Sequence, residues 1–173
     1  MTPRIVLSLA LSATLAGGSA LAQTCQPNIR ATTPASQFVV DAAKGTVLDT
    51  KTGLMWKRCA EGRSGANCAS GSVATYDWQA ALARAANSAH AGYNDWRLPN
   101  AKELESIVED KCYDPAINAA IFPIAPSGWH WSGSPDANNS AYAWYVDFYD
   151  GYSGNDGVSR GGAGAVRLVR GGQ

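Results

Sequence analysis

Nine residues, 96–104, constrain what this chain can fold into more than any other stretch, because a tryptophan, a proline and a helix start follow one another there. Leu98 precedes the proline, which disfavours helical backbone and pushes the residue toward an extended conformation. Asn100 is followed three positions later by Glu103, a spacing typical of the reciprocal cap at the start of a helix. We therefore predict an extended segment that turns into a helix over residues 101–111.

The first 22 residues have the pattern of a signal peptide. Arg4 supplies a positive charge, residues 5–15 form an apolar run, and the Ala-Leu-Ala sequence of residues 20–22 is typical of a cleavage site. The run is shorter than the roughly 20 residues that cross a bilayer, so we expect no retained membrane span. The mature chain is then expected in the periplasm, or secreted to the cell surface or medium.

Length and charge favour one domain and give no sign of nucleic-acid binding. Without the 22 N-terminal residues, 151 of the 173 remain, which is enough for one hydrophobic core. We divide them into an N-terminal segment over residues 23–37 and a single domain over residues 38–173. The full chain carries 14 basic and 14 acidic side chains, whereas a nucleic-acid-binding domain is usually strongly basic.

The chain has four cysteines, all after the predicted cleavage site, and an even number in an exported protein indicates two disulfides. Three pairings are possible. Cys59 and Cys68 bracket a loop of small residues that can close on itself, which favours Cys59–Cys68 and leaves Cys25–Cys112. A zinc site is the alternative, but the chain contains no Cys-x-x-Cys pair.

Residue patterns predict strands first, then two helices, then more strands. The first helix is expected to begin at a Thr75 cap and to run to about Ser88, since apolar residues recur there at helical spacing. After residue 121 glycine, serine, asparagine and aromatic residues dominate, which favours strands and long loops. Alternate side chains of a strand point to opposite faces, so neighbouring residues of the segment 142–148 are expected on opposite faces of a sheet. The predicted strands are residues 38–41, 46–49, 54–57, 128–132, 142–148 and 165–170.

Five short motifs occur together in one order over residues 45–171. They are Asp49-x3-Gly53-Leu54-Met55-Trp56, Trp96-Arg97-Leu98-Pro99-x3-Glu103-Leu104, Trp131-Ser132-x-Ser134, Trp144-x-Val146-x-Phe148 and Val166-Arg167-Leu168-Val169-Arg170-Gly171. With these motifs the chain resembles the DUF1566 family, also called the Lcl C-terminal domain family after a collagen-like bacterial adhesin. More distantly, it is similar to formylglycine-generating enzymes and to the variable proteins of diversity-generating retroelements.

This resemblance implies a C-type-lectin-like α+β fold, in which two helices support a twisted, mostly antiparallel sheet and long glycine-rich loops carry ligands. It also implies an exported or surface binding domain, in some members an adhesin for sulfated polysaccharides. We therefore expect an adhesin-like, non-enzymatic module that recognises a glycan or a protein surface. Formylglycine-generating enzymes rely on cysteines near the C-terminal part of the domain, and this chain has none after Cys112, so that chemistry is not expected.

The loops of the second half carry the predicted ligand-binding residues. Tyrosine offers rigid amphipathic contact area, and small polar residues offer adaptable hydrogen bonds, as in antibody paratopes. Tyrosine faces also stack on sugar rings, and an arginine pairs with sulfate or carboxylate. The alternative is that these tyrosines pack over the sheet edge and belong partly to the core. The predicted residues are Tyr142, Tyr145, Tyr149, Tyr152, Asn155 and Arg160.

The same loops gather oxygen ligands of the kind that bind calcium. The candidates are Asp147, Asp150, Asn155 and Asp156, although their spacing does not match the calcium loop of an EF-hand. Asp and Asn also favour turns by bonding their own backbone, which is the competing interpretation. No cofactor other than calcium is predicted.

An enzyme acting on exported substrates is the alternative from another class, and a structural subunit of a surface assembly is a third. Residues 157–161 spell the Gly-x-Ser-x-Gly nucleophile pattern, but glycines flank it where a strand and a helix are needed. His90 and His130 have no obvious partner in the sequence, and a bond between His130 and Asp147 in a cleft would favour an enzyme. Arg97 is expected to be a structural hydrogen-bonding residue, and no catalytic residue is predicted.

Overall fold

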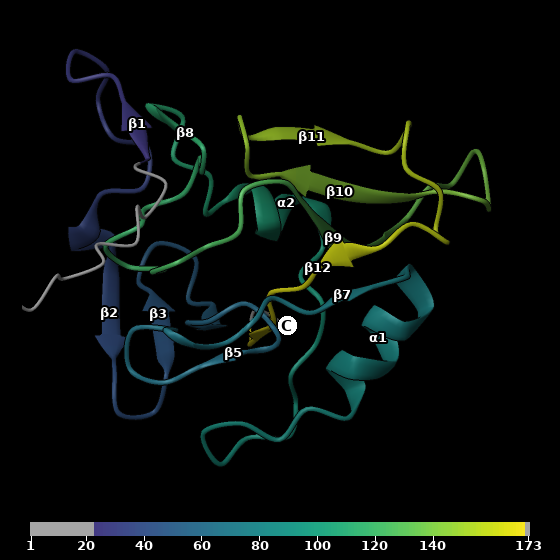
Figure 1. Cartoon of the computed structure of the whole chain (residues 1–173), viewed down its shortest axis with the longest axis horizontal. Coiled ribbons are helices and arrows are strands. Elements are labelled where there is room, and N and C mark those ends of the chain that lie inside the picture. The colour runs from purple at the N-terminus through teal and green to yellow at the C-terminus, as the bar shows by residue number, and fades with distance from the viewer. Residues whose placement is uncertain (1–22, 172–173) are drawn as a thin grey trace, which may run out of the picture.

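The computed structural model describes residues 23–171 and shows an α+β chain, as predicted (Figure 1). Within these residues it has two α-helices, α1 (Trp78–Ala86) and α2 (Ala101–Glu105), and a 3-10 turn at Ala35–Gln37, while the strands pair mostly antiparallel. In this described part, no helix is long and apolar enough to cross a membrane. The predicted signal peptide lies outside the described residues.

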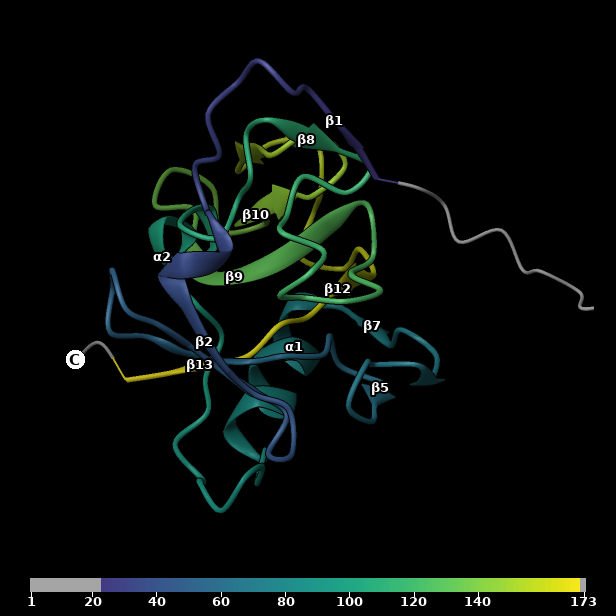
Figure 2. The same cartoon turned by 90° about the vertical axis from the view of Figure 1, so that its left-hand side faces the viewer.

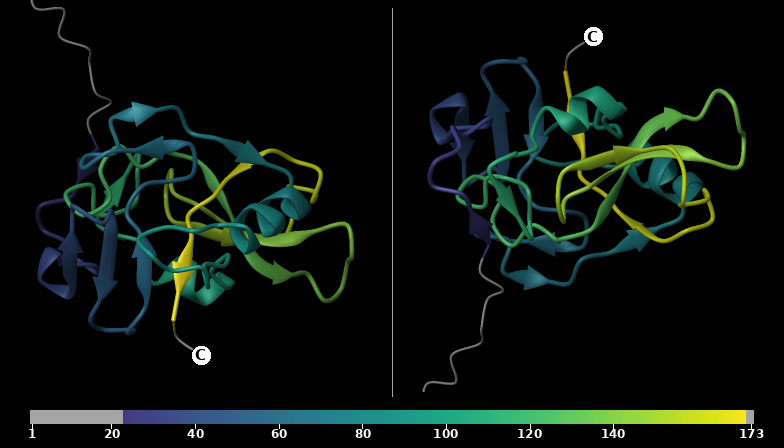
Figure 3. Two further views of the ribbon diagram at one scale, coloured as in Figure 1. Left: turned by 90° about the horizontal axis from the view of Figure 1, so that it is seen from below. Right: turned by 90° about the horizontal axis from the view of Figure 1, so that it is seen from above.

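Two sheets form the body of the molecule, and Figure 3 shows β2 and β3 on one side and the strands β9 to β11 on the other. The larger sheet has the order β11-β10-β9-β12-β7 and is antiparallel except between β12 and β9. The smaller sheet, β13-β4-β3-β2, is antiparallel throughout. Their strands are β2 (Phe38–Asp41), β3 (Thr46–Asp49), β4 (Met55–Lys57), β7 (Thr75–Tyr76), β9 (Trp129–Pro135), β10 (Ala143–Asp147), β11 (Tyr152–Gly154), β12 (Gly164–Ala165) and β13 (Val169–Arg170).

Two further strand pairs lie outside these sheets: β1 (Thr24–Cys25) with β8 (Cys112–Tyr113), and β5 (Arg63–Ser64) with β6 (Ser70–Gly71). The predicted strands 38–41 and 46–49 are confirmed as β2 and β3, and the predicted strand 54–57 is present as β4, which pairs with β3.

The larger sheet separates two hydrophobic cores, as the alternation in residues 142–148 predicts. Val146 and Phe148 belong to the core between the two sheets, which we call the first core. There they join side chains of β2, β3, β4 and α2. Ala143 and Tyr145 belong to the core on the other face, which we call the second core and which includes the buried side of α1. Both faces of this strand are therefore covered by apolar side chains.

The predicted start of the first helix is wrong. Thr75 lies in β7, where it pairs with Ala165 of β12. The helix begins two residues later, and Asp77 is its cap, because the Asp77 side chain accepts a hydrogen bond of 2.7 Å from the backbone N–H of Ala80. Pairing with a strand 90 residues away, which local sequence does not reveal, displaced the cap.

The second helix begins at the predicted cap but is shorter than predicted, ending at Glu105 rather than at residue 111. The backbone N–H of Val108 bonds the carbonyl of Glu105, three residues back rather than four, at 3.0 Å. Val108 then pairs with Ile117 in an isolated bridge. Backbone pairing with a residue nine positions on thus replaces the last turns of the expected helix.

The predicted strand 165–170 is divided between the two sheets as β12 and β13. Between them the chain is extended, and its carbonyl groups accept hydrogen bonds of 2.9 Å: Val166 from the N–H of Glu61, and Leu168 from the N–H of Lys57. One extended segment therefore crosses from the larger sheet to the smaller one.

Residues 97–104 also connect the two sheets. Arg97 and Val169 of β13 exchange backbone hydrogen bonds of 2.9 and 3.0 Å. Two residues on, the carbonyl of Pro99 accepts a bond of 2.7 Å from the N–H of Gly133 in β9. This short stretch therefore contacts both sheets through its backbone before the helix begins.

The side chain of Arg97 completes this connection and is structural, as predicted. Its guanidinium donates two hydrogen bonds of 2.7 Å to the carboxylate of Glu103 and one of 2.8 Å to the carbonyl of Gly171. Glu103 also accepts from the N–H of Asn100, whose side chain accepts from the N–H of Glu103, so the predicted reciprocal cap is present. The cap, the arginine and the C-terminal strand therefore form one network.

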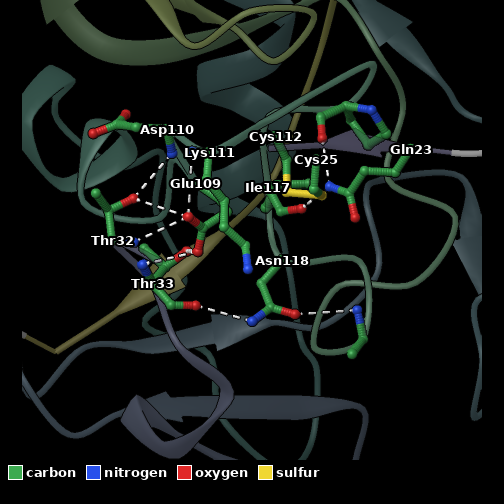
Figure 4. Close-up of a disulfide and its surroundings, with 12 residues drawn as sticks. Gln23, Cys25, Thr32, Thr33, Glu109, Asp110, Lys111, Cys112, Ile117 and Asn118 are labelled. Atoms are coloured by element: carbon green, nitrogen blue, oxygen red, sulfur yellow. Dashed lines mark hydrogen bonds between the residues drawn. A yellow bond between two sulfur atoms is a disulfide. The ribbon is translucent and has the colours of Figure 1, made fainter. Parts of the chain in front are cut away.

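Both predicted disulfides are confirmed. Cys59–Cys68 closes a short loop that contains β5, with a sequence separation of 9. Cys25–Cys112, drawn in Figure 4, joins β1 to β8 across a separation of 87 residues. The second disulfide therefore fixes the N-terminal segment to the chain that follows α2.

Glu109 also fixes the N-terminal segment, a contact that the sequence analysis did not predict. Its buried carboxylate accepts hydrogen bonds of 3.0 Å from the backbone N–H groups of Thr32 and Thr33, and another from the Thr33 hydroxyl (Figure 4). Burial raises the pKa of Glu109, but these hydrogen bonds outweigh burial and hold the pKa below its usual value. A residue predicted to lie within a helix thus serves as an anchor.

His130 and Arg167 are both buried, each only 1% exposed, and they lie in the first core. The His130 ring packs edge-on against Phe148, and its Nδ1 donates to the carbonyl of Gly128 at 3.0 Å. Burial, and then the positive charge of Arg167, lower the pKa of His130 from 6.5 to about 3. His130 is therefore neutral in the folded protein at ordinary pH.

Removal of the long-range disulfide should cost more stability than removal of the short one, because the constraint on the unfolded chain grows with loop length. We expect the paired substitution of Cys25 and Cys112 by alanine to lower the free energy of unfolding by about 4–5 kcal/mol. The same change at Cys59 and Cys68 should cost about 2.5 kcal/mol. Urea unfolding of both variants measures this, and an equal or reversed loss would contradict it.

The depressed pKa of His130 predicts acid lability. The unfolded chain binds a proton at this histidine below about pH 6.5, whereas the folded chain does not until about pH 3, so stability falls as pH falls through that window. The loss should total on the order of 4 kcal/mol. Unfolding measured from pH 7 to pH 4 should show a flatter profile for His130→Gln. Identical slopes for His130→Gln and the wild type would refute the assignment.

Candidate functional site

Three exposed tyrosines form the candidate site: Tyr113 in β8, Tyr149 in the turn between β10 and β11, and Tyr152 at the start of β11. They are 44%, 51% and 52% exposed. The rings of Tyr113 and Tyr149 meet edge to face with centroids 6.4 Å apart. We call these three residues the tyrosine surface.

The backbone around Tyr149 is tied to the chain that follows β8. The carbonyl of Tyr149 accepts a hydrogen bond of 2.8 Å from the N–H of Asp114, and the carbonyl of Phe148 accepts one of 2.6 Å from the N–H of Ala116. Since β8 is held by the Cys25–Cys112 disulfide, both sides of the Tyr113–Tyr149 pair are fixed. The rings are thus presented on a supported backbone, not on a free loop.

The turn between β10 and β11 requires glycine at position 151. Gly151 has a φ of +87°, and a Cβ there would lie 2.7 Å from Cγ1 of buried Val108. Its N–H donates to the carbonyl of Asp147 at 2.8 Å. The turn that contains Tyr149 and leads into Tyr152 is therefore packed tightly against the first core.

Tyr152 lies over its own strand. A Cβ at Gly154 would lie 2.6 Å from the Tyr152 ring, so the ring can occupy this position only because residue 154 has no side chain. Its ring is 6.3 Å from that of Tyr145, and its hydroxyl donates to Oδ1 of Asp156 at 3.4 Å. One face of Tyr152 is packed, and half of the side chain remains in solvent.

Three of the predicted binding residues are used for packing. Tyr145 is only 8% exposed, donates its hydroxyl to the carbonyl of Asp156 at 3.0 Å and belongs to the second core. Tyr142 is half-buried, and its carbonyl accepts a bond of 2.8 Å from Nε of Arg160. The Arg160 guanidinium lies 4.2 Å over the ring of Trp78, so this arginine joins the loop to α1.

The surroundings of the tyrosine surface are acidic. Residues 112–127 and 142–159 contain aspartates but no lysine or arginine. The pKa of Tyr145 is raised, mainly by burial and then by the negative charges around it, those of Asp156 and Asp147 among them. Lys111 and Arg160 lie directly outside these two ranges.

The predicted calcium ligands are spread out rather than gathered. Asp147 Oδ1 accepts from the N–H of Tyr149 at 2.8 Å, and Asp150 Oδ1 accepts from the N–H of Tyr152 at 3.0 Å, both as turn bonds. Asn155 is half-buried between these turns and Asp156. Within residues 23–171, no group of three or more His, Cys, Asp or Glu side chains is arranged to hold a metal ion. Calcium binding stays a prediction.

The sequence features that would suggest catalysis lie apart from one another. His130 is buried and bonds Gly128 rather than Asp147. Ser159 lies in the loop between β11 and β12, and the nearest elements are strands on both sides, not the strand and helix of a nucleophile elbow. Within residues 23–171, His130 makes no hydrogen bond to Asp147 or Ser159.

Tyr113 was missed by the sequence analysis, because it lies 36 residues before Tyr149 and outside the glycine-rich loops. One signal pointed to it. Tyr113 follows Cys112 directly, and a disulfide-anchored aromatic beside a turn is a candidate for a fixed, exposed contact.

Comparison with known proteins agrees with the motif pattern. The sequence model of the Lcl C-terminal domain matches residues 45–170, well over half of the chain. No curated protein was found that matches the chain. The matched region includes Tyr113, Tyr149 and Tyr152, so the tyrosine surface lies within the family's domain. The chain therefore belongs to the Lcl C-terminal domain family.

Proposed function

We propose that this protein is an exported, non-enzymatic binding module that recognises a neutral glycan through the tyrosine surface. The observation that carries the proposal is the exposure of Tyr113, Tyr149 and Tyr152 on a backbone held by a disulfide and by strand pairing. Exposed aromatic side chains that gather in a patch are a feature of interaction sites, whereas single ones are common on any surface. Rings held in place lose little conformational freedom when a ligand binds.

Tyrosine rings suit sugar recognition for a physical reason. The C–H faces of a pyranose ring are apolar and pack on aromatic faces, while its hydroxyls need hydrogen-bond partners. Asp150 and Asn155, next to the tyrosines, supply carboxylate and amide groups for those hydroxyls. The combination of aromatic and small polar groups is the one that antibody paratopes use for adaptable binding.

Charge narrows the ligand class. The segments that carry the three tyrosines contain aspartates and no basic side chain, so a sulfated or carboxylated glycan would meet like charge. Arg160, the predicted partner for such a group, is stacked on Trp78 and bonded to Tyr142. The proposal is therefore restricted to neutral glycans, which departs from the sulfated polysaccharides suggested by the family resemblance.

We further propose that the fold is C-type-lectin-like, with the loops of the second half as the ligand-bearing part. Membership of the Lcl C-terminal domain family supports this, as do two helices and a mostly antiparallel strand arrangement. The two disulfides are consistent with export to an oxidising compartment.

A glycan array probed with the disulfide-bonded protein tests the function. We expect binding to neutral glycans, and the double substitution Tyr149→Ala with Tyr152→Ala should weaken it by at least about tenfold, because each removes an exposed aromatic contact. The melting temperature should change little, since both side chains are half in solvent.

Val39→Ala is the matched control, because Val39 is an exposed apolar residue on β2, 59% accessible and outside the tyrosine surface. This variant should bind as the wild type does. The proposal fails if no neutral glycan binds at micromolar concentration, or if binding survives the double substitution. Capture of acidic glycans alone would also overturn it.

A further inference from the structure

We propose a second ligand site in the described part of the chain: a pocket of about 250 Å³ that takes the oxyanion group of a small ligand, a carboxylate, sulfate or phosphate. Its walls come from the turn between β2 and β3, from the loop closed by Cys59–Cys68, and from His90. The volume is below that of typical drug-sized sites, about 300–1,000 Å³, so it suits one charged group with at most a small ring attached.

The lining side chains carry positive charge and no negative charge. Lys44, Lys57, Arg63 and His90 line the pocket, and none of its lining residues is an aspartate or glutamate. This distribution contrasts with the balanced charge of the whole chain, which has 14 basic and 14 acidic side chains. A positive cleft in a neutral protein concentrates anions locally.

Nearby carboxylates only partly neutralise these bases. Glu61 is fully buried and bonds both Lys57 and Arg84 at 2.6 Å, so one carboxylate serves two cations. Lys44 has only an exposed, longer contact of 3.4 Å with Asp41. Positive charge is therefore left over at the pocket.

Arg63 has the greatest unused hydrogen-bonding capacity of this group. Its Nη1 donates to the carbonyls of Cys68 and Gly71 at 3.3 and 3.5 Å, and no carboxylate pairs with it among the described residues. Its Nε is buried and has no hydrogen-bond partner within the same residues. An oxyanion in the pocket can accept charge-assisted hydrogen bonds from the accessible N–H groups of this guanidinium, whereas the buried Nε becomes available only if the side chain moves.

The walls are rigid. The loop that carries Arg63 is closed by the disulfide and by the β5–β6 pair, and a Cβ at Gly62 would lie 2.2 Å from the carbonyl oxygen of Ser72. On the other wall, Nε2 of His90 lies 3.2 Å from the carbonyl of Gly45. The basic groups are thus attached to fixed backbone, which lowers the entropic cost of binding.

This pocket is separate from the tyrosine surface. Both Figure 1 and Figure 2 show the β2–β3 turn at the lower end of the molecule and the β10–β11 hairpin at the upper end. The inference therefore does not depend on the glycan proposal, and each can fail without the other.

Titration of the ¹⁵N-labelled disulfide-bonded protein tests this site, with sodium glucuronate and sodium sulfate as probes and glucose as the neutral control. Sodium chloride keeps the ionic strength constant. We expect saturable shifts confined to amides of residues 42–45, 63–66 and 90. Tighter binding of glucuronate would identify a carboxylate site, and tighter binding of sulfate a tetrahedral oxyanion site; either result supports the proposal.

Two substitutions and a control complete the test. Arg63→Gln should weaken binding at least about tenfold, and Lys44→Gln about threefold, since Lys44 is exposed at the rim. Lys51→Gln, at an exposed lysine outside the pocket, should leave the affinity unchanged. Lys44→Gln keeps the test valid if Arg63→Gln lowers the melting temperature. Shifts spread over all surface lysines, equal shifts with glucose, or an affinity that neither Lys44→Gln nor Arg63→Gln lowers would overturn the proposal.

Discussion

The hydrogen bonds between Arg97 and Glu103 are the interaction on which the rest of the structure depends. Glu103 belongs to the cap of α2, and Arg97 is paired through its backbone with β13, so the ion pair joins a helix start to the C-terminal strand. The guanidinium holds the Glu103 pKa below its usual value although burial alone would raise it. Bidentate geometry adds direction to the attraction, which fixes the angle at which the chain enters the helix.

This network positions both cores and, through them, the tyrosine surface. Leu98 packs in the second core, whereas Leu104 packs in the first, so the segment changes sides of the larger sheet within a few residues. Beyond the helix, Val108 lies against the Gly151 turn, and Cys112 joins the N-terminal segment. The exposed tyrosines are therefore carried at the end of a continuous chain of packed elements that begins at Arg97.

Local features of this fold were predictable, and most long-range ones were not. The Cys25–Cys112 disulfide is an exception, because it follows by exclusion once Cys59 pairs with Cys68. The cap at Asn100, the strands of residues 38–41 and 46–49 and the Cys59–Cys68 loop depend on neighbours in sequence, and all three are confirmed. The end of α2 and the division of the last strand depend on backbone pairing that the residue pattern does not reveal, that of Val108 with Ile117 and that of β13 with β4. The same distinction explains why Tyr149 was predicted and Tyr113 was not. Loop composition pointed to Tyr149, whereas the position of Tyr113 depends on a backbone hydrogen bond between Asp114 and Tyr149.

A double-mutant cycle on Arg97 and Glu103, read by urea unfolding, tests the central claim most directly. Arg97→Met and Glu103→Gln should each destabilise the protein, and the double variant should lose about 1–3 kcal/mol less than the sum, because either change alone breaks the same network. Amide exchange should accelerate at Val169 and in α2 together. Additive losses, with exchange unchanged at Val169, would show that the two side chains act separately and would contradict the account.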